Sequence, residues 1–443
     1  MNQLVAVGLL GERQRRVARA DRILSRLTGR IPRVSLEERR GVRVRGGDML
    51  LLASGEYGDV DLSGLANSGF VTIAAAPGAR PHFTSLDLSR ASHFVLRGIT
   101  VTAGRAPPER RQLVSVYAPG EARADNIVLD DLDIGSTLAI AATPQNAFVA
   151  RAPDGIVLAG DCLTLTGAEV HDAMTAVEIY RARQVLIADN TFRDFAIDGI
   201  QYSGRSIVIC DNIVIDQWPT SSLLHPDCMQ GTGSDEAAFG PVLITGNVCI
   251  RSIGLRAARP GGHVYDGGWQ GIVIFDGHWS GVMVRCNLVL PAAGHGIALY
   301  GVDDALIEGN VVLGLNGGPA SWIAALPAKN GRQSTNVVIR KNQAMAFLNA
   351  VKSAQAPFET MIDALGVNRE DSEILAMLRG ELSGVSVAEG NVWQTAQVAR
   401  PPLGFDERFE WTTGVQSKIP RDVPEARQIH PLPEACKVKT DAG

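Results

Sequence analysis

The stretches VLIADNTF at residues 185–192 and IVICDNIV at residues 207–214 decide the fold, because each is an apolar run that ends at an asparagine. Similar runs recur further along the chain, as VLITGNVC, VMVRCNLV, LIEGNVVL and VVIRKNQA. The asparagines that mark the repeat are Asn190, Asn212, Asn247, Asn287, Asn310, Asn342 and Asn391. The shortest unit, about 22 residues, is the length of one turn of a parallel β-helix. Such a solenoid buries the apolar face of each coil only against neighbouring coils.

The asparagines themselves are predicted to be structural. An inward-facing side-chain amide at a turn can bridge to the coils on either side, and asparagine tolerates the left-handed backbone of a tight turn. Apolar residues occupy the same position in earlier coils, namely Ile99, Leu132 and Ala168. The flanking residues alternate as one inward stripe, comprising Val185/Ile187, Ile207/Ile209, Val242/Ile244, Val282/Val284 and Val337/Ile339.

The repeat divides the chain into four parts. Residues 1–40 are expected to form an N-terminal helical segment, which either caps the first coil or serves for attachment or oligomerisation. Residues 41–352 are predicted to form the β-helix, and residues 353–400 a helical insertion followed by a last coil. Residues 401–443 read as an irregular, Pro-rich tail. The expected fold class is therefore all-β, with helices only at the N-terminus and near the C-terminus.

Composition excludes several classes of function. The chain has 443 residues, of which 42 are basic and 47 acidic, so its net charge of −5 and the lack of a basic run argue against nucleic-acid binding. No apolar stretch reaches 18 residues, which predicts no membrane span. The N-terminus lacks the features of a signal peptide, which predicts synthesis in the cytoplasm. The six cysteines show no CxxC spacing and read as buried free thiols rather than as disulfides or a metal site.

Insertions between the repeats indicate where a binding site lies. The units from Asn212 to Asn247, from Asn247 to Asn287 and from Asn310 to Asn342 are longer than 22 residues, and insertions in solenoids map to loops on one side. These segments carry aromatic residues that either stack on sugar rings or cover small cores of the loops themselves: Trp218, Tyr265, Trp269 and Trp279.

Polar residues recur beside these insertions, each group near the expected start of a strand. Equivalent positions on a parallel sheet stack about 4.8 Å apart, so one polar line is predicted and a second beside it. The first line comprises the catalytic candidates Asp198, Asp227, Asp266 and His295. The second line and its surroundings supply the substrate-binding candidates Glu178, Gln201, His225, Gln230, His263, Trp269 and Gln270.

Stacked carboxylates admit more than one chemistry. Repulsion between them raises one pKa, which provides the acid and base that glycosidic cleavage requires. The same oxygens suit a hard cation such as Ca²⁺, although no cofactor is required by the pattern. A surface that binds polysaccharide without cleaving it needs only the hydrogen-bonding groups. The Asp-Gly pairs are also typical of ordinary turns, which is the structural alternative.

Over residues 40–350 the chain resembles the right-handed parallel β-helix proteins of the pectate lyase superfamily. The stretches GGDMLLLASGEYGDV and VTIAAAPGARPHF are similar to the first coils of chondroitinase-B-like polysaccharide lyases. Asp198-Gly199, Asp227-Cys228 and Gly294-His295-Gly296 are similar to elements of polygalacturonases. The resemblance implies a right-handed parallel β-helix that acts on, or binds, polysaccharide. Spike proteins of bacteriophages and gene-transfer particles use the same fold and are usually trimers.

These observations predict a polysaccharide-recognising protein, with a particle-associated spike or receptor-binding protein favoured and a free polysaccharide lyase or glycoside hydrolase as the alternative. A purely structural solenoid is a third reading. The expected partner is a bacterial surface polysaccharide, and the spike reading adds a homotrimer attached to a particle through its N-terminal segment. If cleavage occurs, Asp227 is the expected general acid, Asp198 or Asp266 the base, and His225, His263 and His295 the substrate-positioning groups.

Overall fold

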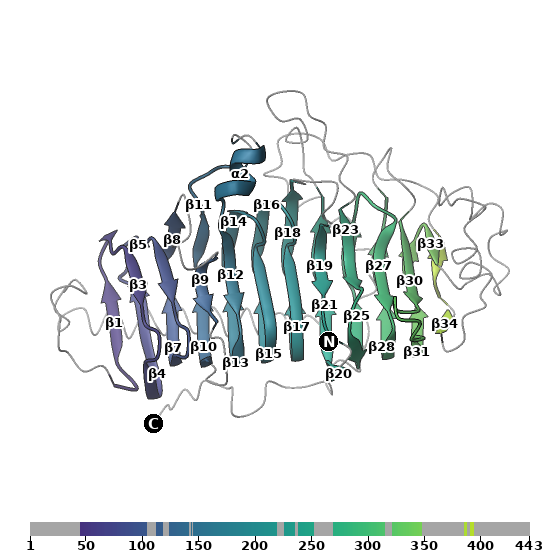
Figure 1. Cartoon of the computed structure of the whole chain (residues 1–443), viewed down its shortest axis with the longest axis horizontal. Helices are drawn as coiled ribbons and strands as arrows, with labels where there is room; N and C mark the ends of the chain where they lie inside the picture. Colours follow the sequence, from purple (N-terminus) through teal and green to yellow (C-terminus); the bar gives the residue numbers. More distant parts are fainter. Residues whose placement is uncertain are drawn as a thin grey trace.

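The structure is a computed structural model that describes residues 45–103, 112–117, 124–140, 143, 145–218, 226–234, 238–251, 269–314, 321–347, 385–387 and 390–393. Within these residues the chain winds into coils stacked along one axis, and Figure 1 shows strands of successive coils side by side. Neighbouring coils are joined by parallel pairing between equivalent strands. The predicted parallel β-helix is therefore confirmed in the described part of the chain.

Each coil contributes to three faces, which follow one another along the chain as the first, second and third face. The first face contains β3 (Asp59–Asp61), β6 (Ser85–Asp87), β9 (Gln112–Val116), β12 (Asp154–Leu158), β19 (Asp227–Gly231), β23 (Gln270–Ile274), β27 (His295–Tyr300), β30 (Trp322–Leu326) and β33 (Ala346–Phe347). Two long strands begin on the first face and continue on the second, namely β15 (Val177–Ala188) and β17 (Ile200–Cys210).

The other two faces complete each coil. The second contains β1 (Met49–Leu52), β4 (Ala66–Ala75), β7 (Ser92–Arg97), β10 (Ala124–Asp130), β13 (Gly160–Thr166), β20 (Ala238–Phe239), β21 (Val242–Thr245), β24 (His278–Ser280), β25 (Val282–Arg285), β28 (Val302–Glu308), β31 (Thr335–Arg340) and β34 (Val385–Val387). The third contains β2 (Gly55–Glu56), β5 (Pro81–Phe83), β8 (Thr100–Ala103), β11 (Asp133–Ser136), β14 (Glu169–Ala173), β16 (Thr191–Phe195), β18 (Ile213–Gln217), β22 (Val248–Ile250), β26 (Leu288–Leu290), β29 (Val311–Val312), β32 (Gln343–Ala344) and β35 (Val392–Trp393).

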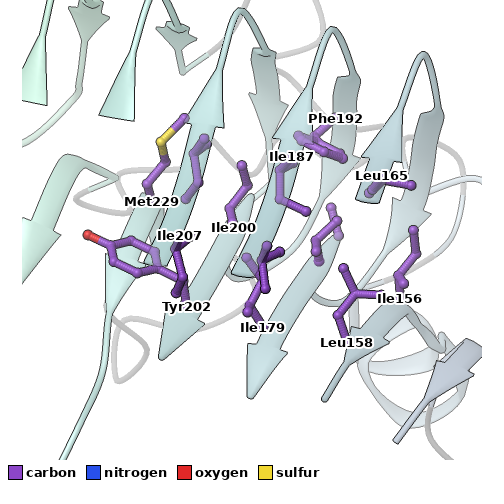
Figure 2. Packing of buried hydrophobic residues seen from close by; sticks show 14 of the residues in the cluster. Ile156, Leu158, Leu165, Ile179, Ile187, Phe192, Ile200, Tyr202, Ile207 and Met229 are labelled. Carbon is purple, nitrogen blue, oxygen red and sulfur yellow. The ribbon is translucent and has the colours of Figure 1, made fainter. Parts of the chain in front are cut away.

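The interior is a continuous stack of apolar side chains from all three faces. Leu158, Ile179 and Tyr202 occupy equivalent positions in three successive coils and lie in line in Figure 2. All three are buried, as is the whole predicted inward stripe of the second face. Each large apolar side chain buried in this way contributes about 1.5–3 kcal/mol, so the stack is the main stabilising element of the fold.

The asparagine ladder is confirmed as a continuous hydrogen-bonded row between the second and third faces. In each step the Nδ2 group donates to Oδ1 of the asparagine in the next coil, as in Asn190 to Asn212 at 2.9 Å and Asn212 to Asn247 at 2.9 Å. The same Oδ1 also accepts the backbone N–H of the preceding asparagine. The row continues through Asn287, Asn310, Asn342 and Asn391, and Ala168 joins it by donating its N–H to Asn190.

One detail of the predicted turn is wrong. The left-handed residue is the one before the ladder asparagine, with φ of 58° at Asp189, 56° at Asp211 and 70° at Gly246. The asparagines are held by hydrogen bonds to both neighbouring coils, so the turn places its left-handed residue where the side chain faces outward. Aspartate and glycine are suited to this backbone conformation.

The cysteine prediction is also wrong in part. Cys228 on β19 and Cys249 on β22 form a disulfide that joins the first face to the third across the interior. Among the described residues, Cys210 and Cys286 are free thiols, as predicted.

The structure also contains a short helix that the sequence did not predict. Helix α2 (Gln145–Arg151) stands between β11 and β12, at the edge where the chain returns to the first face (Figure 1). Phe148 of this helix packs with Met174, Ala196 and Trp218 in a small apolar cluster. The helical segments expected in residues 1–40 and 353–400, and the tail at 401–443, lie outside the described residues.

We predict that Asn247→Ala lowers the free energy of unfolding by about 3 kcal/mol, because it removes buried hydrogen bonds to both neighbouring coils. Asn391→Ala is the matched control at the half-buried end of the ladder and is expected to cost less. Urea denaturation followed by circular dichroism measures both values. Equal losses in the two variants would contradict a cooperative ladder.

Candidate functional site

Asp198 and Asp227 lie next to each other at the starts of neighbouring strands on the first face. The register of β17 and β19 pairs Ile200 with Met229, which places the two aspartates opposite each other. The backbone N–H of Asp227 donates to Oδ1 of Asp198 at 2.9 Å, and the N–H of Gly199 donates to the carbonyl of Asp227 at 3.0 Å. Two carboxyl groups are therefore brought together by ordinary parallel pairing.

The residue after each of these positions points into the interior. A Cβ atom at Gly199 would lie 2.4 Å from Cγ1 of Val214 on the third face, so only glycine fits there. Gly271 and Gly296 meet the third face in the same way. Cys228 occupies the equivalent position in the coil of Asp227, where its disulfide reaches the third face. This close packing fixes the backbone directly beside both aspartates.

Both carboxyl groups are withdrawn from solvent. Asp198 is 3% exposed and Asp227 is 0% exposed. Burial raises the pKa of Asp198 to about 7, with a further increase from the charge of Glu178 and an opposing effect from the N–H of Asp227. Burial and the charge of Asp198 raise the pKa of Asp227 well above its ordinary value. The pair therefore holds at least one proton near neutral pH.

Polar atoms around Asp227 lack hydrogen-bond partners among the described residues. Both carboxyl oxygens of Asp227 are in this state, as are Nε1 of Trp269 and Oε1 of Gln270. Gln270 is the register neighbour of Asp227 in the next coil. Buried polar groups are usually hydrogen-bonded, so a cluster of unpaired ones calls for a functional explanation.

The second predicted line is present, with one correction. Glu178, Gln201 and Gln230 are register neighbours in three successive coils, and Nε2 of Gln201 donates to Oε1 of Gln230 at 3.1 Å. Gln201 also reaches Oδ2 of Asp198 at 3.4 Å, which links the two lines. Gln270 does not continue this line, because Val273 is the residue paired with Gln230.

His295 stands in the first line, one coil beyond Gln270 and away from the aspartates. Its Nε2 lies 2.9 Å from the Tyr300 hydroxyl, and its ring lies 4.4 Å from that of Trp322. Burial raises the pKa of Tyr300 to about 12, so this phenol keeps its proton at neutral pH. The structure thus places His295 within an aromatic cluster, and the catalytic role expected from its place in the line lacks direct contact with the carboxyl pair.

The predicted stacking of tryptophan rings on sugars is wrong, because the tryptophans are buried. Trp269 is 0% exposed, and Trp279 and Trp218 are also buried, so none of the three offers a ring face to a sugar. Trp279 belongs to the main core and Trp218 to the cluster beside α2, in agreement with the alternative that these rings cover apolar cores. Other predicted site residues lie outside the described residues, namely His225, His263, Tyr265 and Asp266.

Several half-exposed or exposed rings on the outer side of the first face were not predicted from the sequence. These are Tyr117, Tyr180, Phe275, Tyr300 and Trp322. The first four directly follow the last inward residue that their coil contributes to the first face, so strand alternation predicts that they point outward. A search limited to the insertions could not find them.

A metal site finds no support in the described part of the chain, where no group of three or more histidine, cysteine or acidic residues is arranged to hold an ion. Calcium binding therefore stays a prediction. No helix among the described residues is long and apolar enough to cross a membrane.

Comparison with known proteins gives similarity at the level of the fold. No protein-family model matches the chain, and no curated protein matches it. Similar solved structures include the A-module of the Azotobacter vinelandii mannuronan C-5 epimerase AlgE6, at 14% identity over 68% of this chain and 79% of that one, with a TM-score of 0.43. The pectate lyase Pel9A shows 14% identity over 87% and 81% of the two chains, with a TM-score of 0.36.

The Dettilon tailspike protein is a further match, at 11% identity over 81% of this chain and 62% of that one, with a TM-score of 0.30. All three are parallel β-helix proteins, and their names refer to polysaccharide-modifying enzymes and a tailspike.

The raised pKa of Asp198 predicts a pH-dependent stability difference between the wild type and Asp198→Asn. Below about pH 4 the carboxyl is protonated in both the folded and unfolded states. Between about pH 4 and pH 7 it ionises only in the unfolded state, so the wild type loses stability as the pH rises. The variant lacks this loss, and its stability relative to wild type should increase from pH 4.5 to pH 7.5 in urea titrations. A difference that does not change with pH would show an ordinary pKa.

Proposed function

We propose that this protein cleaves a polysaccharide by acid–base hydrolysis of a glycosidic bond, with Asp198 and Asp227 as the reacting carboxyl groups. The observation that carries the proposal is the stacked, buried pair in which Asp227 keeps both oxygens unpaired among the described residues. Retaining two buried carboxyl groups side by side costs stability, which a purely structural strand would avoid. Catalysis explains why both are present.

The two carboxyl groups differ in the way that the reaction requires. Asp227, whose carboxyl oxygens accept no hydrogen bond from the described residues and whose pKa is raised by burial, is the protonated general acid. Its carboxyl is 0% exposed, so the proposal requires that substrate binding opens access to it. Asp227 then gives its proton to the glycosidic oxygen as the bond from that oxygen to the anomeric carbon breaks. Asp198, with a pKa of about 7, is ionised in part at neutral pH and accepts a proton from the attacking water. The water oxygen bonds to the anomeric carbon, and proton exchange with solvent restores the pair.

Neutral hydrogen-bonding groups beside the pair suit a sugar. Gln201 and Gln230 lie half-buried in the row next to the aspartates, and their amides both donate and accept hydrogen bonds. Sugar hydroxyls have the same dual capacity. A short row of amides next to an acid–base pair therefore fits a polyhydroxylated substrate.

A second candidate is a polysaccharide-binding spike that does not cleave. The hydrogen-bonded pair Gln201–Gln230 favours it, because binding through amides needs no ionisable group. The trimer and the particle attachment through residues 1–40 belong to this candidate and are proposals of the same standing. If the wild type binds a polysaccharide and releases no cleavage product, the non-cleaving spike is the better candidate.

We predict that Asp227→Asn reduces cleavage at least a hundredfold and leaves polysaccharide binding nearly unchanged, since general acid catalysis typically contributes 10² to 10⁴ in rate. The assay measures new reducing ends on a panel of bacterial surface polysaccharides, together with retention in polysaccharide-containing native gels. Asp161→Asn is the matched control. Asp161 lies on β13 of the second face, where its carboxyl pairs with Arg183 of β15. Turnover retained in Asp227→Asn would rule out the assigned acid.

A further inference from the structure

Aromatic rings lie on the outer side of the first face in coils before and after the two coils that carry the carboxyl pair. Tyr117 and Tyr180 belong to coils that precede the pair, and Phe275 and Tyr300 belong to coils that follow it. Each ring directly follows the last inward residue of its coil on this face, and those inward residues are linked in register through Val116, Leu158, Ile179, Tyr202, Gly231, Ile274 and Leu299. The four rings therefore belong to one row that runs across the strands.

The row lacks a ring at Ala159, between Tyr117 and Tyr180, and it is interrupted over the two consecutive coils that carry the aspartates. The equivalent residues there are Ser203, which follows Tyr202, and Thr232, which follows Gly231. Both have small hydroxyl side chains. The gap in the aromatic row thus falls in the coils of Asp198 and Asp227, five residues further along the chain than the aspartates, and leaves the outer side of these coils without a large ring.

The rings before the gap form one small cluster. Tyr180 is 40% exposed, and its ring meets that of Tyr117 edge to face with centroids 5.9 Å apart. The Arg181 guanidinium carbon lies 5.7 Å from the Tyr180 ring centroid. The backbone N–H of Arg181 donates to Oγ of Ser203 at 2.8 Å. This cluster, Tyr117–Tyr180–Arg181, is the preceding platform.

The rings after the gap form a larger cluster. The centroid of the Phe275 ring lies 5.1 Å from that of Tyr300 and 5.5 Å from that of His295. The His295 ring in turn packs against the Trp322 ring. Ala298 lies between His295 and Tyr300 on the same strand and is fully buried, so its small side chain lets the two rings meet above it. This half-exposed cluster, Phe275–His295–Tyr300–Trp322, is the following platform.

We propose that the two platforms are sugar-binding subsites in the coils before and after those of the carboxyl pair, so that an extended glycan lies across the strands and is cleaved internally. This inference rests on the proposed function for the position of the cut, whereas binding to the platforms stands by itself. Aromatic side chains offer large, rigid apolar faces with polar edges. Such a surface matches the apolar face and hydroxyl rim of a sugar ring.

The distance between the two platforms is long enough for several sugar residues. Tyr180 and Tyr300 belong to coils separated by four strand steps, through β17, β19 and β23, which corresponds to roughly 19 Å at about 4.8 Å per step. Both ends of this span have exposed or half-exposed rings, and the two coils that carry the acid–base pair lie between them. A site that bound only a chain end would need just one platform.

The first test measures binding by retardation in native gels cast with dextran, galactomannan, xanthan, alginate or polygalacturonate. Tyr180→Ala and Trp322→Leu should each weaken retardation by the bound polysaccharide roughly two- to tenfold, the range expected for loss of one aromatic contact. Leu65→Ala, which removes another exposed apolar side chain, in the turn directly before β4, is the matched control and should bind like the wild type. Tyr180 is well exposed, so its variant is expected to fold, and Trp322→Leu keeps apolar volume.

The second test measures where the chain is cut. Internal cleavage predicts that viscosity falls early, while few reducing ends have formed, and release of short fragments from one end would overturn the inference. Retardation in none of the gels, or unchanged retardation of both ring variants, would also overturn it. If Asp227→Asn stops cleavage while the ring variants bind normally, the proposed function stands without the platforms. If the ring variants lose binding but the wild type yields no product, the platforms stand without the cleavage.

Discussion

Stacking of equivalent residues by parallel pairing is the constraint on which the rest of this structure depends. Each coil repeats the backbone course of the previous one, so a residue type that recurs at one position forms a row through the molecule. The asparagine row is the clearest case, since Oδ1 of each asparagine from Asn212 to Asn391 accepts two hydrogen bonds from the preceding asparagine. Because these bonds are buried and directional, they oppose a shift of register between coils.

The same constraint that stabilises the ladder also brings two carboxyl groups close enough to repel each other at the candidate site. Rows of amides are favourable because an amide both donates and accepts, whereas a row of carboxylates repels. At Asp198 and Asp227 the backbone geometry forces two carboxyl groups into adjacent coils, and burial prevents water from screening them. The result is a raised pKa in both groups, so that the pair holds at least one proton near neutral pH. The fold thus gives two ordinary side chains the raised pKa values on which the proposed acid–base pair rests.

The inward stripes and the ladder could be predicted from sequence because their signals are local and repeat in each coil. The position of Gln270 was missed because its motif was aligned with that of Gln230, across a long insertion. Alignment on the inward residues Ile272 and Met229 instead gives the observed pairing of Gln270 with Asp227. The disulfide between Cys228 and Cys249 could not be predicted in this way, because it joins different faces across the interior. The burial of Trp269 likewise depends on packing, which strand alternation does not reveal.

The central claim is that Asp227 carries a proton at neutral pH, and infrared difference spectroscopy tests it directly. The spectrum of the wild type minus that of Asp227→Asn, recorded at pH 7, reports the carbonyl stretch of a protonated carboxylic acid separately from carboxylate bands. The account predicts a positive carboxylic-acid band in this difference. A carboxylate band in its place would show that Asp227 is ionised and would contradict the proposed acid–base pair.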